Sequence, residues 1–139
     1  LYKGEILGFT VGNDMSSRSI EGENPLYLPQ AKVYNRCCSI GPCLVSTRSL
    51  KDPHNLAIRC VITRGGSEVF AGETSTSQMS RKCEELADWL QRHNAVMNMT
   101  TILTGTGVVP PPDFTLQEGD VVIVSIEDIG MLENDVVVV

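Results

Sequence analysis

A run of alternating residues that ends at Asn13 and Asp14 constrains the fold of this chain more than any other part of its sequence. Across residues 6–12, the apolar residues Leu7, Phe9 and Val11 occupy every second position. A period of two is the pattern of a β-strand with one apolar face. The alternation stops at Asn13 and Asp14, whose short polar side chains hydrogen-bond to nearby backbone and turn the chain. The pattern therefore predicts Asp14 at the C-terminal end of a strand, where its carboxylate faces any cleft beyond that end.

Spacing alone leaves two interpretations of Asp14 open. In the first, its carboxylate is a metal ligand or a catalytic group. Arg18 then follows one helical turn later, and Lys32 adds a second positive charge suited to an anionic substrate. In the second, Asp14 is the N-cap of a short helix over residues 15–20, and Arg18 is its partner in a surface salt bridge. The residue types do not separate these two interpretations.

The composition limits the classes of protein to which the chain can belong. Its 139 residues are 42% hydrophobic and 20% charged, which is typical of one soluble globular domain with its own core. The formal net charge of −6 argues against nucleic acid or an anionic membrane as partner, because the chain has no basic stripe to meet phosphates. No apolar run approaches the roughly 20 residues of a membrane span, and no signal peptide opens the sequence.

The five cysteines are not spaced as zinc ligands, and neither His54 nor His93 lies at zinc-finger spacing. An odd number of cysteines without a secretory signal fits a reducing compartment, in which cysteines act as small buried hydrophobic residues. We therefore expect a cytoplasmic protein.

Residues 15–30 are predicted to be irregular, because Gly22, Pro25 and Pro29 prevent a long helix. A polar segment of this kind, placed between a strand and Lys32, indicates a binding loop or lid; the alternative is a surface excursion. Residues 31–34 are predicted to form a short strand. Lys32 then lines the cleft or, as most isolated lysines do, extends to solvent.

The rest of the chain predicts a mostly β, mixed α+β fold with one main helix. Strands are expected over residues 39–46, 56–63, 68–71, 101–104, 120–126 and 135–139, and Gly65 and Gly66 predict a tight hairpin turn. Apolar residues recur at helical spacing over residues 79–93, where we expect the helix, capped by Thr76 or Ser77. Trp89 and Met79 are expected in the core.

Six segments of the chain, in order, resemble motifs of the fumarylacetoacetate hydrolase superfamily. They are residues 12–18 (GNDMSSR), 24–34 (NPLYLPQAKVY), 39–42 (SIGP), 103–107 (LTGTG), 116–120 (LQEGD) and 126–134 (IEDIGMLEN). The insert at residues 21–30 resembles the 2-keto-3-deoxy-arabinonate dehydratase branch, whereas the hydrolase branch usually carries Gln at the place of Glu21. The resemblance implies a fumarylacetoacetate hydrolase-type mixed β-roll with one main helix.

The resemblance also implies a divalent cation, Mg²⁺ or Mn²⁺, held by oxygen ligands of which Asp14 is one. Other ligands of the family form a Glu-x-Glu pair upstream of the position of Asp14, and no such pair precedes Asp14 here. We therefore expect residues 1–139 to be the C-terminal portion of a longer catalytic domain, and this portion alone to be inactive.

By the same resemblance, Lys32 is a candidate for the base or for stabilising an enolate, and Arg18 for gripping a carboxylate or ordering the lid. Glu21 is a candidate proton donor to the leaving hydroxyl. Thr106, flanked by glycines, matches a residue that contacts the substrate carboxylate; the alternative is a plain turn. Ser19 stands where the family usually has an Asp, so we expect either that Arg18 is less firmly oriented or that Ser19 replaces the Asp as a weaker partner.

These residues imply dehydration of a 2-keto-3-deoxy sugar acid through a metal-stabilised enolate. The alternatives are hydrolysis of the C–C bond of an acylpyruvate or related diketone, and a non-catalytic fragment that serves as a binding module. The expected partner is a small 2-oxo acid, and the resemblance implies a homo-oligomer, a dimer or higher.

Overall fold

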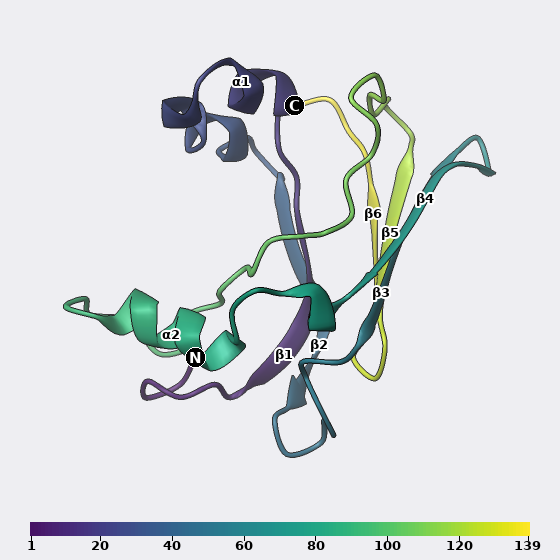
Figure 1. Cartoon of the computed structure of the whole chain (residues 1–139). Helices are drawn as coiled ribbons and strands as arrows, with labels where there is room; N and C mark the ends of the chain where they lie inside the picture. Colours follow the sequence, from purple (N-terminus) through teal and green to yellow (C-terminus); the bar gives the residue numbers. More distant parts are fainter.

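Six antiparallel strands form the framework of the structure, a computed structural model that describes residues 1–139. They form a two-stranded sheet of β1 and β2 and a four-stranded sheet in the order β4-β3-β5-β6. The mostly β architecture predicted from the sequence is therefore confirmed (Figure 1). The strands are β1 (Gly8–Asp14), β2 (Cys38–Ser46), β3 (Ala57–Arg64), β4 (Ser67–Ser75), β5 (Val121–Ile126) and β6 (Gly130–Asp135).

Strand β1 ends at Asp14 as expected, but its residues do not alternate between buried and exposed: the pairing register shifts between Phe9 and Val11, and Leu7 is exposed. Val11, in the middle of the apolar set, is fully buried. Gly8 pairs with Ser46 of β2, and a Cβ at Gly8 would meet the carbonyl oxygen of Val45. The first residue of β1 must therefore be small, because the two strands approach too closely there for a side chain.

The core lies between the two sheets, because both contribute to it. Val11 of β1 and Leu132 of β6 belong to one buried cluster, which also contains Leu50, Leu56 and Ile129. None of the five cysteines is buried, so the expectation that they fill the core is wrong. The five buried residues of the cluster are all aliphatic, with Phe9 packed against them, and the cysteines are half-buried or exposed.

The hairpin of β3 and β4 is confirmed, although β4 runs further than predicted. Gly65 and Gly66 form its turn with φ of +56° and +80°, a conformation that side chains strongly disfavour. The Gly-Gly pair fits the two positive φ angles of the turn that matches the twist of paired strands.

The main helix, α2 (Cys83–Gln91), begins later than predicted. The backbone is extended at Met79 and at Lys82, so a helix cannot run through them. Thr76 and Ser77 are not its caps; they lie in the 3₁₀ helix η3 (Thr76–Gln78).

Trp89 is not a core residue: it is 56% exposed, and the guanidinium of Arg92 lies 4.0 Å from its ring centroid. Met79 is half-buried. Ala87 is the one buried residue of α2, so this helix lies against the rest of the chain over a narrow strip.

Two of the predicted strands are absent or displaced. Residues 101–104 form no strand; the side chain of Leu103 instead lies against Gly12 of β1, where it would clash with a Cβ. The last strand is β6, not residues 135–139, because a tight turn starts the ladder with β5 already at Gly130. Polar residues such as Glu133 and Asn134 interrupt the apolar pattern by which a strand is predicted, because the positions of β6 that are not buried need no apolar side chain.

The segment between β1 and β2 consists of short helices and no strand. They are α1 (Arg18–Glu23) and two 3₁₀ helices, η1 (Pro25–Tyr27) and η2 (Gln30–Lys32). The predicted strand over residues 31–34 is wrong because Pro29 has helical backbone angles and starts a turn. We call residues 17–32 the cap; α1 lies beyond the C-terminal end of β1 (Figure 1).

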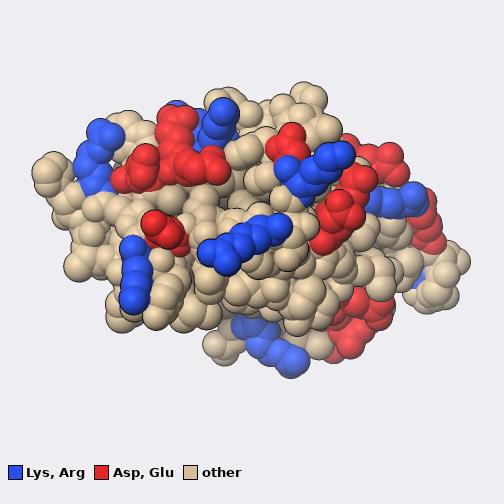
Figure 2. Space-filling view, turned by 90° about the horizontal axis from the view of Figure 1, so that it is seen from below, with Lys and Arg blue, Asp and Glu red and all other residues tan.

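The structure contains no helix with the length and hydropathy that a membrane span requires. On the face shown in Figure 2, acidic and basic side chains are interspersed, and the basic ones do not gather into one patch.

Candidate functional site

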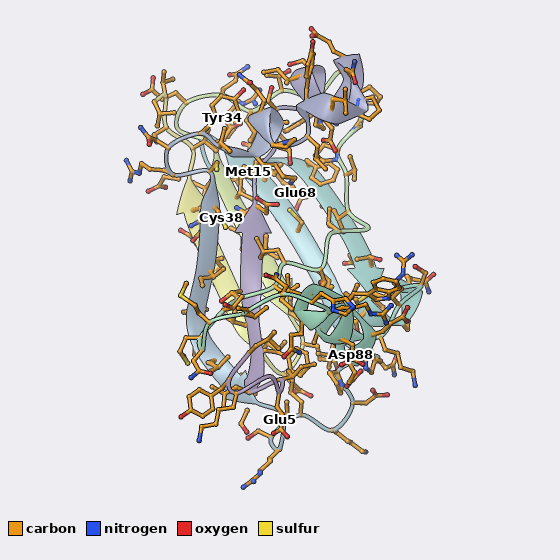
Figure 3. The ribbon with its side chains drawn as sticks, turned by 90° about the vertical axis from the view of Figure 1, so that its left-hand side faces the viewer. Glu5, Met15, Tyr34, Cys38, Glu68 and Asp88 are labelled. Carbon is orange, nitrogen blue, oxygen red and sulfur yellow. The ribbon has the colours of Figure 1, made fainter.

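The C-terminal end of β1 places Asp14 where the sequence predicts it. Asp14 pairs with Cys38, the first residue of β2, and Met15 N–H donates to the carbonyl oxygen of Cys37 over 2.8 Å. Figure 3 shows Met15, Cys38 and Tyr34 at the same end of the molecule, beneath the cap, with Glu5 at the opposite end. The end of the sheet is therefore fixed by backbone pairing, which makes it a rigid base for a site.

Lys32, the last residue of the cap, contacts Asp14 at the end of β1. Its Nζ donates to Asp14 Oδ2 over 2.7 Å and to Ser16 Oγ over 2.6 Å. The side chains of Lys32 and Asp14 are 32% and 28% exposed, so the pair is shielded on most sides but open to a small molecule. Neither residue extends freely into solvent.

The helix-cap interpretation of Asp14 is wrong. Asp14 belongs to β1, and the N-cap of α1 is Ser17, whose side chain makes no capping hydrogen bond. The short helix begins at Arg18, later than the predicted range of residues 15–20. The carboxylate of Asp14 is bound by an ammonium and not by the backbone of a helix.

Arg18 is not the salt-bridge partner of Asp14 either. Its guanidinium donates to three backbone carbonyl oxygens, those of Pro110 (2.7 Å), Pro111 (3.1 Å) and Phe114 (2.6 Å). Ser19, which stands in place of the family's usual Asp, lies with its Oγ 3.3 Å from that of Ser17 and makes no hydrogen bond to Arg18. Arg18 is thus held firmly by backbone oxygens without an acidic neighbour.

Glu21 and Thr106 are exposed, and the structure does not bond either of them to the Lys32–Asp14 pair. Glu21 lies in the first turn of α1, with its backbone N–H on the carbonyl oxygen of Ser17. Thr106 Oγ1 accepts from the N–H of Val108 over 3.0 Å and donates to its carbonyl oxygen over 3.3 Å. Thr106 therefore forms the plain turn that the sequence left open as an alternative.

The thiol of Cys38 lies beside Asp14 but is not activated. Burial raises its pKa above the ordinary value, the negative charges of Asp14 and Cys37 raise it further, and Lys32 lowers it. Cys38 therefore stays a neutral thiol near neutral pH and supplies no thiolate nucleophile.

Sequence reasoning missed several residues that support the site. Ser16 is one, although its place two residues after Asp14 in a polar turn was a usable signal. Asn134 is another: it accepts from Asn13 Nδ2 and donates to Ser39 Oγ, each over 3.1 Å, and so joins β6 to both strands of the smaller sheet. Asn134 is distant in sequence, and no local pattern predicts this contact.

The site contains one side chain, Asp14, that is suited to act as a ligand of a hard cation. Asp14 Oδ1 carries no protein hydrogen bond, and a carboxylate oxygen suits Mg²⁺ or Mn²⁺. No group of three or more His, Cys, Asp or Glu side chains in the chain is placed to hold a metal ion. The residues of this chain therefore do not complete a metal site by themselves.

Comparison with known proteins relates this arrangement to a family. A model of the family described as fumarylacetoacetate (FAA) hydrolase C-terminal matches residues 3–137. The chain is 57% identical over 139 residues to the probable 2-keto-3-deoxyxylonate dehydratase of Haloferax volcanii, covering 100% of this chain and 48% of that protein. It is 43% identical over 129 residues to the 2-dehydro-3-deoxy-D-arabinonate dehydratase of Saccharolobus solfataricus, covering 93% and 43%.

A solved structure, 2-keto-3-deoxy-D-arabinonate dehydratase complexed with magnesium and 2,5-dioxopentanoate, superposes with a TM-score of 0.92 at 42% identity. The match covers 94% of this chain and 47% of that one. The chain spans about half the length of the curated relatives it matches.

Proposed function

The chain belongs to the fumarylacetoacetate (FAA) hydrolase C-terminal family, and from that premise we propose that the intact protein dehydrates a 2-keto-3-deoxy sugar acid. The relatives named as such dehydratases support this activity. The observation that carries the proposal is the contact of Lys32 with Asp14 and Ser16 at the end of β1, which presents an ammonium to a small anionic molecule.

The reaction removes the elements of water from the substrate. A base of the intact protein takes a proton from C3, the hydroxyl on C4 departs as water after it gains a proton, and a C3–C4 double bond forms. The C5 hydroxyl compound then rearranges through an enol to the C5 aldehyde, which gives a 2,5-dioxo acid. Negative charge develops on the 2-oxo oxygen while C3 loses its proton, so a fixed positive charge near that oxygen accelerates the reaction.

Lys32 is suited to this task. As an ammonium it has three N–H donors, of which two are used by Asp14 and Ser16. The third is free for the enolate oxygen. We assign Lys32 the stabilisation of the enolate and Glu21, on the exposed first turn of α1, the proton for the leaving hydroxyl. Thr106 is proposed to hold the substrate carboxylate.

Asp14 is proposed to supply one oxygen ligand to Mg²⁺ or Mn²⁺ in the intact protein, with further ligands from a part of the protein outside residues 1–139. Such a cation, when bound, polarises the 2-oxo group. We further propose a cytoplasmic homo-oligomer that takes a small 2-oxo acid as substrate.

Replacement of Lys32 tests the proposal. In the intact protein, Lys32→Met should lower kcat on 2-keto-3-deoxy-arabinonate by roughly a hundredfold or more, the usual cost of removing one group that stabilises an oxyanion. Lys51→Met, which removes an exposed lysine outside the site, is the matched control and should keep full activity. Mg²⁺ affinity, measured by calorimetry, should be retained in both variants.

Formation of the 2,5-dioxo product is followed directly, so the reaction type is read independently of the variant. If the intact protein cleaves acylpyruvates and leaves 2-keto-3-deoxy acids untouched, the proposed dehydration is wrong and hydrolysis takes its place.

A further inference from the structure

Residues 110–120, which we call the strap, begin with three prolines that cannot donate hydrogen bonds to one another's carbonyl oxygens. Prolines have no N–H, so the carbonyl oxygens of Pro110 and Pro111 find no donor within their own run. Arg18 supplies a donor to each, although the carbonyl oxygen of Pro111 also accepts the N–H of Phe114 over 3.0 Å. Arg18 also binds the carbonyl oxygen of Phe114. One guanidinium therefore fastens the first turn of the cap to the first half of the strap.

The second half of the strap is fastened by another arginine. Arg64, the last residue of β3, donates to both oxygens of Asp120, from Nε over 2.7 Å and from Nη2 over 2.8 Å. Nη2 also donates to the carbonyl oxygen of Thr115 over 3.0 Å. Asp120 is fully buried and additionally accepts the N–H of Gln117 over 2.9 Å. Two-point binding of a carboxylate by a guanidinium fixes both distance and orientation.

Aromatic packing supports the same segment. The centroid of the Phe114 ring lies 5.9 Å from the centroid of the Phe70 ring in β4. The guanidinium carbon of Arg64 lies 6.0 Å from the centroid of the Phe114 ring. The carbonyl oxygens that Arg18 uses are thus held by contacts with the four-stranded sheet.

Hydrogen bonds within and next to the cap link the position of Arg18 to the position of Lys32. Ser17, next to Arg18, donates its N–H to the carbonyl oxygen of Ala31 over 2.9 Å, and Ala31 is fully buried next to Lys32. Ser16, on the other side of Ser17, accepts the bond from Lys32 Nζ. The position of Lys32 therefore depends on residues 16–18, and the position of Arg18 depends on the strap.

We propose that Arg64 and Asp120 are positioning residues for the reaction, because they fix the strap that holds Arg18 and, through it, the cap and Lys32. Neither makes a hydrogen bond to Lys32 or Asp14. The proposal concerns the site of the proposed dehydration and rests on that function for its kinetic part. Its structural part concerns the mobility of the cap and stands on its own.

Hydrogen exchange of the intact protein tests the structural part. Arg64→Gln should raise the exchange of backbone amides in residues 16–32 by roughly tenfold or more, because the cap then opens locally at lower free energy. Arg59→Gln is the matched control: Arg59 lies on the same strand but pairs only with the exposed Glu68 and Glu73. It should change exchange in the cap less than about twofold.

A second variant gives the direction of the coupling. Arg18→Lys keeps the charge but cannot reach all of its carbonyl partners, so it should loosen the cap while residues 115–120 stay protected. Arg64→Gln should loosen both segments. If exchange in the cap is unchanged by Arg64→Gln, or rises equally with Arg59→Gln, the strap does not hold the cap and the proposal is overturned.

Kinetics test the catalytic consequence. Arg64→Gln should lower kcat by roughly tenfold to a hundredfold with a smaller change in KM, as expected when a catalytic group is displaced by about 1 Å. Arg64→Lys, which keeps an ion pair with Asp120, should recover part of this loss. A wild-type protein that does not dehydrate would contradict the proposed function and leave the exchange result to decide the role of the strap. A kcat that is unchanged while the cap is loosened would refute the positioning role.

Discussion

At the scale of single residues, the ion pair of Asp120 with Arg64 makes the stability of the fold depend on pH. The hydrogen bonds from Arg64, and then that from Gln117 N–H, lower the pKa of Asp120 from 3.8 to about 2 in the folded protein. The unfolded chain therefore takes up the proton first as the pH falls. The stabilisation by the charged carboxylate is fully present above about pH 4 and is lost between about pH 4 and about pH 2.

Denaturation of the intact protein at a series of pH values should show this loss. Asp120→Asn should be less stable than wild type at neutral pH and should lose less stability on acidification. Asp113→Asn, which replaces an exposed carboxylate in the same segment, is the control and should follow the wild-type curve. Equal acid sensitivity of wild type and Asp120→Asn would contradict the assignment.

At the scale of elements, the turn of the β3–β4 hairpin has a measurable backbone requirement. Gly66 has a φ of +80° and open space around it, so a methyl group there meets no atom and acts only through backbone strain. Gly66→Ala should destabilise the protein by about 1 kcal/mol. Gly22→Ala is the matched control, because Gly22 also has open space but lies in α1 without a positive φ. It should be neutral or stabilising by up to about 1 kcal/mol. Urea denaturation of both variants measures the difference.

The elements also show what the sequence can predict and what it cannot. Strands with an alternating apolar face and a defined turn, such as β1 and the β3–β4 hairpin, were predicted because their signals are local. Asp14 and Lys32 were named from motifs, and the structure brings them together. The partners of Arg18 and Asn134 lie far away in sequence, so no local pattern indicates them. Residues 101–104 were mistaken for a strand because their apolar side chains pack across β1 without pairing to it.

At the scale of the whole molecule, residues 1–139 expose more surface than a complete domain of their mass. The accessible surface is 9532 Å², whereas a mass of 15.1 kDa predicts about 7,000 Å². Exposed apolar side chains include Leu26, Val33, Met97 and Val138. In the longer protein that we propose, further residues would cover part of this surface.

The isolated chain should therefore unfold at lower denaturant concentration than the intact protein and should bind an apolar fluorescent dye under native conditions. The intact protein, at equal concentration, should bind little dye. Equal stability and dye binding of the two would show that the exposed surface is not an interface with the rest of the protein.

Cation binding should also distinguish the isolated chain from the intact protein. A single carboxylate does not retain Mg²⁺ against its hydration shell, so calorimetry should detect no micromolar binding to the isolated chain. The intact protein should bind, and Asp14→Asn should weaken that binding. Micromolar affinity of residues 1–139 alone would prove the ligand count wrong.

The two contacts that close the cap at its base, from Ser17 to Ala31 and from Lys32 to Ser16, also bear on how such a protein can change. Together with the bonds from Arg18 to the strap, they fix both ends of residues 19–30. Lengthening a closed flexible loop is inexpensive, since each doubling adds only about 0.6 kcal/mol. In the proposed dehydratase, substrate preference can therefore diverge between descendants through replacement of the loop tip alone, while the spacing of Lys32 and Asp14 is inherited unchanged.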